Sequence, residues 1–129
     1  MGMINVKKNY SFLCDYASVT REGKLSMNGI FESFNSKAFP LIFPSFFVVV
    51  NISGARNGDA FICDLVFEGD NSRKIFSIKG QVKIDSEKNF GFIGQLINVN
   101  FEKAGNYEIV FYIAGNKLES HSFQVRKIS

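Results

Sequence analysis

The sequence predicts an all-β protein, a single antiparallel β-sandwich of roughly eight strands. Apolar and polar side chains alternate with a period of two along most of the chain, as in strands with one buried face. Turn-forming Gly, Asn and Asp residues recur about every ten residues. Aromatic residues favour strands, and the chain has 15 Phe and 4 Tyr. Its 129 residues suit one domain, so we expect residues 1–129 to form one β-sandwich domain, with residues 1–8 loosely ordered.

Alternation defines the expected strands, and turns separate them. The clearest strand runs from Ile75 to Ile84, where every second residue from Phe76 onward is apolar or glycine and the others are polar. Phe46 to Ile52 is almost wholly apolar, which predicts a central strand that is covered on both faces or lies under a long loop. The expected strands are 9–19, 24–34, 46–54, 60–68, 73–84, 90–101, 106–114 and 117–126.

Two of these strands change phase along their length. Phe92 and Phe101 lie on opposite parities of the strand 90–101, with Gly94 near the change. The strand 117–126 changes parity around His121. An extra residue in one strand of a pair produces such a change, so we expect a β-bulge in each strand.

The assigned strands place much of the phenylalanine surplus in the core. The rows that we expect to face inward contain Phe12, Phe61, Phe67, Phe76 and Phe111. Each of these rings can be buried between two sheets without a polar partner.

Charge and hydropathy exclude several classes of partner. The net charge is +3, but the basic residues are scattered among acids and form no cluster of the kind that nucleic acid requires. The longest apolar run, Phe46 to Val50, is far shorter than the roughly 20 residues that span a bilayer. We therefore expect no nucleic-acid partner and no membrane association. No secretory signal is visible, so we expect a cytoplasmic location with Cys14 and Cys63 reduced, a disulfide between them being the minor alternative.

The sequence offers few groups for catalysis. His121 is the only histidine, the side chain whose ordinary pKa lies nearest neutrality. Ser120 and Ser122 should point to the opposite face, because adjacent residues of a strand alternate. Metal-ligand spacing and a glycine-rich phosphate loop are both missing. We expect no catalytic residue, no cofactor and no metal site, and hence no enzyme; an enzyme centred on Asp15, Lys24 or His121 is the alternative.

One pair of opposite charges is expected within the sheet. Asp15 lies inside the first strand, where a buried acid needs a partner. Lys24 begins the next strand and would face the end of the first strand in a hairpin. We interpret Asp15 and Lys24 as a buried ion pair; the sharper interpretation is a binding site.

The connection 33–45 is long and unusually apolar. Exposed, it would present more apolar surface than a loop normally shows to water, as an interaction site does. Folded back, it would close one end of the core as a lid held rigid by its two prolines. The candidate residues are Phe34, Phe39, Pro40, Leu41, Ile42 and Phe43.

Several short motifs together resemble a known family. In chain order they are Cys14-Asp15-Tyr16-Ala17, Gly23-Lys24-Leu25, Gly29-Ile30-Phe31, Phe39-Pro40 and Pro44. They resemble a family of small bacterial proteins of unknown function over most of the chain. The segment from Phe101 to Tyr107, followed by the turn at Gly115, resembles the last hairpin of many immunoglobulin-like sandwiches. These resemblances imply a small all-β domain, immunoglobulin-like or related, and imply no functional residue.

The function therefore stays open at this level. The first hypothesis is a non-catalytic structural or protein-interaction module that binds a protein partner or forms a homo-oligomer through the 33–45 connection. The alternative is a module that binds a small ligand, lipid or carbohydrate, although the absence of Trp counts against a sugar site.

Overall fold

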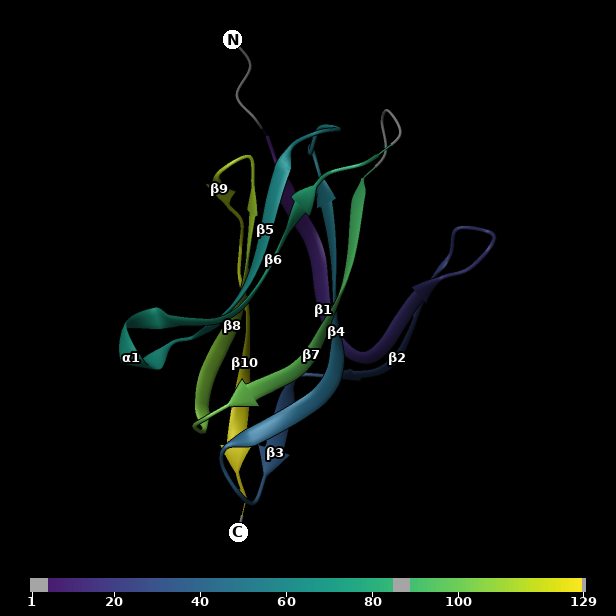
Figure 1. Ribbon diagram of the computed structural model, residues 1–129. Coiled ribbons are helices and arrows are strands. Elements are labelled where there is room, and N and C mark those ends of the chain that lie inside the picture. The colour runs from purple at the N-terminus through teal and green to yellow at the C-terminus, as the bar shows by residue number, and fades with distance from the viewer. Residues whose placement is uncertain (1–4, 85–88, 129) are drawn as a thin grey trace.

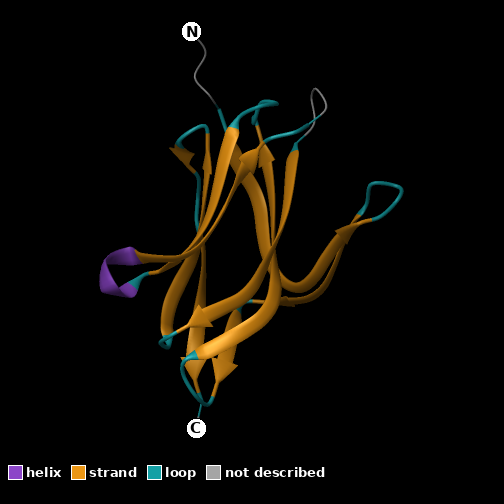
Figure 2. Ribbon diagram, viewed as in Figure 1, coloured by secondary structure: helices purple, strands orange, loops and turns teal. Residues whose placement is uncertain are grey.

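The computed structural model describes residues 5–84 and 89–128 and consists almost entirely of strands (Figure 1; Figure 2). The all-β prediction is confirmed. A single short helix, α1, occurs among the described residues and forms the turn between two neighbouring strands. The elements are β1 (Lys7–Val19), β2 (Leu25–Phe31), β3 (Ser33–Ser36), β4 (Leu41–Ser53), β5 (Ala60–Phe67), α1 (Gly69–Ser72), β6 (Arg73–Gln81), β7 (Phe90–Phe101), β8 (Gly105–Ile113), β9 (Asn116–Lys117) and β10 (His121–Lys127).

The strands form two sheets packed face to face. Sheet A has the order β2-β1-β4-β7, and sheet B has the order β3-β10-β8-β5-β6, with β9 paired to β8. All neighbouring strands are antiparallel except β3 and β10, which are parallel. The prediction of a purely antiparallel sandwich is wrong at this pair, because the chain crosses from sheet A to sheet B after β2 and enters β3 alongside the last strand.

The core lies between the sheets and is built largely from aromatic rings. Phe46, Val48, Val50 and Ile52 of β4 point into it from the middle of sheet A, which confirms the predicted central strand. All 15 phenylalanines lie in the described residues, and none of them is exposed. Phe12 was expected to face inward, but it pairs with Val49, whose side chain lies on the outer face of sheet A.

β4 and β7 bend together, and this bend explains the phase change in β7. The buried positions of β7 change parity between Leu96 and Val99, not at Gly94. The register between the strands is continuous across this point, so no bulge is present there. Asn98 has a positive φ of 53° and lies opposite Pro44. Both strands therefore exchange their inner and outer faces at the same level, and the pairing is preserved.

Two predicted strands are interrupted. The segment 24–34 divides at Glu32 into β2 of sheet A and β3 of sheet B. The segment 117–126 divides into β9 and β10, so its phase change comes from a break in the strand and not from a bulge at His121. Register shifts occur instead near Asn9 in β1 and near Ile75 in β6.

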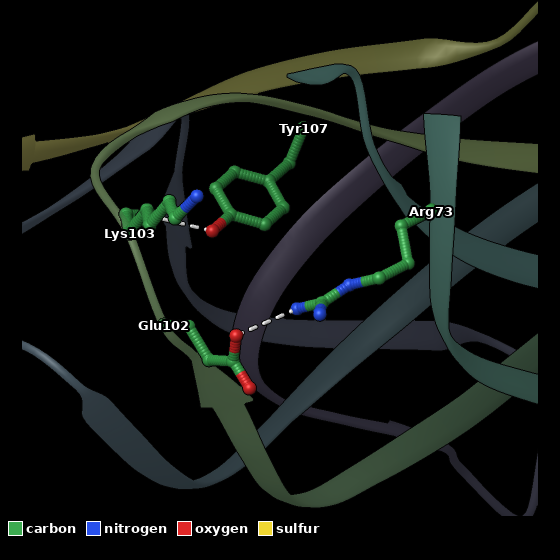
Figure 3. Close-up of polar contacts among 4 residues, drawn as sticks. All are labelled: Arg73, Glu102, Lys103 and Tyr107. Carbon is green, nitrogen blue, oxygen red and sulfur yellow. Dashed lines mark hydrogen bonds and ion pairs between the residues drawn. The ribbon is translucent and has the colours of Figure 1, made fainter. Parts of the chain in front are cut away.

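The strand order is that of an immunoglobulin-like sandwich. With β1, β4 and β7 taken as strands A, B and E, and β6, β5, β8 and β10 taken as C′, C, F and G, each sheet has the immunoglobulin arrangement. Tyr107 enters β8 just after the chain has crossed from β7, and its hydroxyl donates a hydrogen bond of 2.6 Å to the carbonyl of Lys103 (Figure 3). This contact is a tyrosine corner, which such sandwiches use at the equivalent crossing.

The first strand begins earlier than expected. Lys7 and Lys8 already belong to β1 and pair with Ser53 and Ile52 of β4. The loose order of the segment 1–8 stays a prediction. Its first part, residues 1–4, lies outside the described residues. Among the residues described, no helix has the length and hydrophobicity needed to cross a bilayer.

Candidate functional site

The apolar segment 33–45 is not the loop that the sequence suggested. Its first four residues are β3 and its last five residues begin β4, so only residues 37–40 connect the two strands. Phe34 is buried, and its ring contacts five other phenylalanine rings at centroid distances of 4.4–6.0 Å. Phe39, Leu41 and Phe43 are partly buried against the same core. Ile42 is 62% exposed. The segment thus has the position expected of a lid, with Ile42 and Pro40 at the surface.

The expected buried ion pair is wrong. Asp15 and Lys24 are both exposed, and they lie at different levels of the β1–β2 hairpin. Asp15 is opposite Gly29, whereas Lys24 is in the turn, where its backbone N–H donates to Thr20. The sequence could not show that β1 leaves the core before it reaches Asp15.

The two cysteines are separate, free and buried. Cys63 belongs to the main core, whereas Cys14 lies in a small outer cluster with Ala17 and Val49. Burial raises the pKa of the Cys63 thiol to about 12, and burial also raises the pKa of Cys14. Within the described residues, no group of three or more His, Cys, Asp or Glu side chains could hold a metal ion.

The single histidine belongs to a polar cluster that joins the two sheets. His121 Nδ1 on β10 lies 2.8 Å from Ser11 Oγ on β1. Lys8 Nζ donates to the same hydroxyl at 3.1 Å and reaches the carbonyl of Ser120 at 3.5 Å. Ser120 donates to Glu108 at 3.0 Å. Burial lowers the pKa of both His121 and Lys8, and the positive charge of Lys8 lowers that of His121 further.

Sequence reasoning missed Ser11 as the partner of His121. Ser120 and Ser122 are the neighbours of His121 in the chain, but the serine that contacts the imidazole lies 110 positions away, on another strand. No local signal indicates such a contact, since it depends on which strands of the two sheets lie side by side. A groove of about 580 Å³ begins at His121 and follows β10. Ser11 does not line it, so the serine and histidine are not presented together to a ligand in that groove.

The β1–β2 hairpin forms a second feature that the sequence did not reveal. Its two strands bend at Asp15, where Gly29 on the opposite strand has a φ of +68°. Beyond the bend the hairpin leaves the body of the sandwich (Figure 1). Ala17 and Met27 then pack with Cys14 and Val49 over the outer face of sheet A.

A groove of about 230 Å³ separates the hairpin tip from sheet A. Val19, Gly23 and Leu25 line it on the hairpin side, and Tyr10 and Ile93 are among the residues on the sheet side. The described residues expose eight large hydrophobic side chains. Four of them, Tyr16, Val19, Leu25 and Ile30, lie on the hairpin. A fifth, Tyr10, lies on β1 where this strand pairs with β4, on the sheet side of the groove, and the exposures of the five are 37–60%.

Comparison with known families agrees with the motifs in the sequence. The sequence model of the "Family of unknown function (DUF6941)" matches residues 9–126. The chain belongs to this family. The resemblance to a family of unknown function is thereby confirmed, and membership in DUF6941 assigns no activity to any residue. No curated protein matches the chain.

Solved structures show a similar fold at very low sequence identity. The alkylpurine DNA glycosylase AlkC of Pseudomonas fluorescens, bound to DNA containing an abasic site analog, superposes with a TM-score of 0.55 and 8% identity over 97% of this chain. The DUF6941 chain covers 31% of the length of that glycosylase, so the likeness concerns the fold of one part of it. An immunoglobulin-like protein of Pseudomonas aeruginosa has a TM-score of 0.47 and 10% identity, with 95% of this chain and 97% of that one covered.

Proposed function

We propose that this DUF6941 protein is a non-catalytic interaction module that binds another protein through the β1–β2 hairpin and the groove between its tip and sheet A. The observation that carries the proposal is the concentration of exposed apolar side chains on this one element. Single exposed apolar residues are ordinary on a protein surface, but a contiguous group marks an interaction site.

The hairpin surface has the composition of a protein-binding site. Tyr10 and Tyr16 provide large amphipathic rings, a residue type enriched at interfaces. The groove, which Tyr10 lines, also has Asn51 and Asn89 in its lining, so that it combines apolar and polar groups as an interface does. Its volume of about 230 Å³ is below the range of about 300–1,000 Å³ that is typical of small-molecule sites. It suits one apolar side chain of a partner.

The polar cluster around His121 supports a module without catalysis. Ser11 has a histidine and a lysine as neighbours, but the hydroxyl is held between two strands and does not line the adjacent groove. We propose a structural role for it, the joining of the two sheets at an open side of the sandwich. We also propose a reducing, cytoplasmic location, in which Cys14 and Cys63 remain free thiols.

The test is site-specific photocrosslinking in the cells that make the protein. A benzophenone amino acid replaces Leu25, which lines the groove, or Ile128, which is similarly exposed but follows β10 of sheet B and does not line the groove. We expect a discrete protein adduct, with a partner or a second copy, from position 25 and none from position 128.

A second variant tests the same surface with the crosslinker at a neighbouring position. With the crosslinker at Val19, the additional change Leu25→Asp should abolish the adduct, because it places a charge in the apolar groove. Adducts of equal yield from positions 25 and 128, or no adduct at position 25, would contradict the proposal.

A further inference from the structure

The outer edge of sheet A, as far as the structure describes it, is a strand without charges. β7 is the last strand of that sheet among the described residues, and its 12 residues include no charged residue and no proline. Native edge strands usually carry charges or prolines, because an uncovered edge pairs readily with another strand. The corresponding edge of sheet B, β6, carries Arg73, Lys74 and Lys79 within nine residues. The edge of sheet A therefore lacks the charges that hinder the edge of sheet B from pairing with another strand.

A cleft separates β7 from β6. The strands are close in the middle, where a Cβ added to Gly94 would lie 3.1 Å from Ile78. Toward the start of β6 a cleft of about 390 Å³ lies between them. Phe76 and Val99 give it apolar walls, and the side chain of Ile97 at its rim is 53% exposed. An extended segment placed here could pair with β7 and set alternate side chains into the cleft.

The charges at the cleft favour an acidic segment. Its lining includes the two cations Arg73 and Lys74 and one acid, Glu102, and Lys74 also lies 3.6 Å from the carboxylate of Asp64 outside the lining. Arg73 and Glu102 form an ion pair of 2.9 Å between the start of β6 and the end of β7 (Figure 3). Both side chains are about half exposed, at 46% and 49%. Exposed ion pairs of this kind contribute little to stability and are screened by salt. A carboxylate from outside could therefore replace Glu102 at Arg73.

We propose that the β6–β7 cleft binds an extended, acidic segment of another polypeptide, which adds to sheet A as a strand beside β7 and places a carboxylate on Arg73. Main-chain hydrogen bonds to the edge give such complexes their affinity, and the pockets beside the edge give them their selectivity. The cleft lies beside the second half of β7, whereas the groove of the β1–β2 hairpin is lined by residues near the start of β7, such as Ile93, so the two sites share no lining residue.

The test selects peptides without assuming their sequence. A display library of random peptides about as long as β7 is panned on the wild-type protein. We expect the selected peptides to alternate apolar and polar positions and to be rich in Asp and Glu. Binding of the best peptide should weaken at least about tenfold in Ile97→Asp, which adds a like charge at the rim, and should weaken in Arg73→Gln. It should strengthen in Glu102→Gln, because this variant removes the competing carboxylate.

Matched variants locate the binding and separate it from the hairpin. Lys127→Gln removes an exposed cation from β10, and Leu25→Asp alters the hairpin; neither should change peptide affinity. Failure to select acidic peptides, or binding that is unchanged in Ile97→Asp and Arg73→Gln, would overturn the proposal. Neither result would affect the proposed function of the hairpin. Light scattering that finds a dimer which Ile97→Asp dissociates would also overturn it, since a second copy would then occupy the edge.

Discussion

His121 and Ser11 are joined across the two sheets by a single hydrogen bond of 2.8 Å. β1 belongs to sheet A and β10 to sheet B, and these strands are not neighbours in either sheet. Lys8 donates to the same hydroxyl, so three polar side chains satisfy one another at the side of the core. Because the imidazole is partly buried beside a lysine, its protonation state should matter for stability.

The stability of the protein should fall as the pH is lowered through the range where histidine titrates. In the unfolded chain the imidazole takes up a proton near its ordinary pKa of 6.5, whereas burial and Lys8 lower the pKa of His121 in the folded protein. Below pH 6.5 the unfolded state therefore binds more protons than the folded state, and the free energy of unfolding decreases. Urea denaturation at pH 7.5 and at pH 5.5 measures the difference.

The variant His121→Gln separates this effect from the titration of carboxylates. Glutamine keeps a polar group near Ser11 but does not titrate, so its stability should change less between the two pH values. Ser11→Ala should lower stability at both values and retain the pH dependence. An equal loss in the wild type and in His121→Gln would show that His121 does not contribute.

Among the elements, the β1–β2 hairpin departs most from a regular sandwich. Leu13 faces the core, but Ala17, of the same parity, packs on the outer face of sheet A. The exchange of faces occurs at Asp15 and Tyr16, both exposed, opposite Gly29 with its positive φ. This bend brings the hairpin over sheet A and creates the groove at its tip.

The groove therefore depends on glycine at position 29. An L-residue in the left-handed region costs about 1–2 kcal/mol, and an added Cβ at Gly29 would also meet the side chain of Asp15. Gly23 is the matched control, because its φ is +84° but nothing lies within 4 Å of an added Cβ. We expect Gly29→Ala to lower the free energy of unfolding more than Gly23→Ala, as measured by urea denaturation.

Removing the neighbouring side chain tests the origin of the difference. In an Asp15→Ala background the excess cost of Gly29→Ala over Gly23→Ala should shrink, because the carboxyl group of Asp15, which lies nearest to the added methyl group, is removed and only the Cβ at 3.0 Å remains. An excess that persists unchanged would mean that the backbone conformation, and not the contact with Asp15, sets the cost.

Sequence periodicity reveals the strands of this molecule but not the crossings between its sheets. Alternation located β5, β6, β7 and β8 closely, since each has one face on the core. It did not reveal the break at Glu32, because the residues before and after Glu32 are as apolar as those of one continuous strand. Alternation also could not reveal the hairpin groove or the Ser11–His121 contact. Both depend on residues that only the arrangement of the sheets brings together.

At the scale of the whole molecule, Phe34 links both sheets at one end of a shared core. It lies on β3 of sheet B and contacts Phe43, Phe46 and Phe101 of sheet A as well as Phe123 of sheet B. Removal of the Phe34 ring leaves a cavity that neither sheet can fill alone. We expect Phe34→Ala to lower the free energy of unfolding by about 3–5 kcal/mol. Ile42→Ala, at an exposed position of the same segment, should change it by no more than about 0.5 kcal/mol.

Because both sheets share one core, the substitution Phe34→Ala should lower the stability of the whole domain and not that of one sheet alone. Far-ultraviolet circular dichroism reports the strands, and tyrosine fluorescence reports the packing of rings such as Tyr107, which stacks on Phe123. In Phe34→Ala the two signals should shift together to a lower urea concentration, in a single transition. If the transitions separate, the end closed by β3 unfolds on its own. If Phe34→Ala costs no more than Ile42→Ala, the segment 33–45 is not a lid on the core.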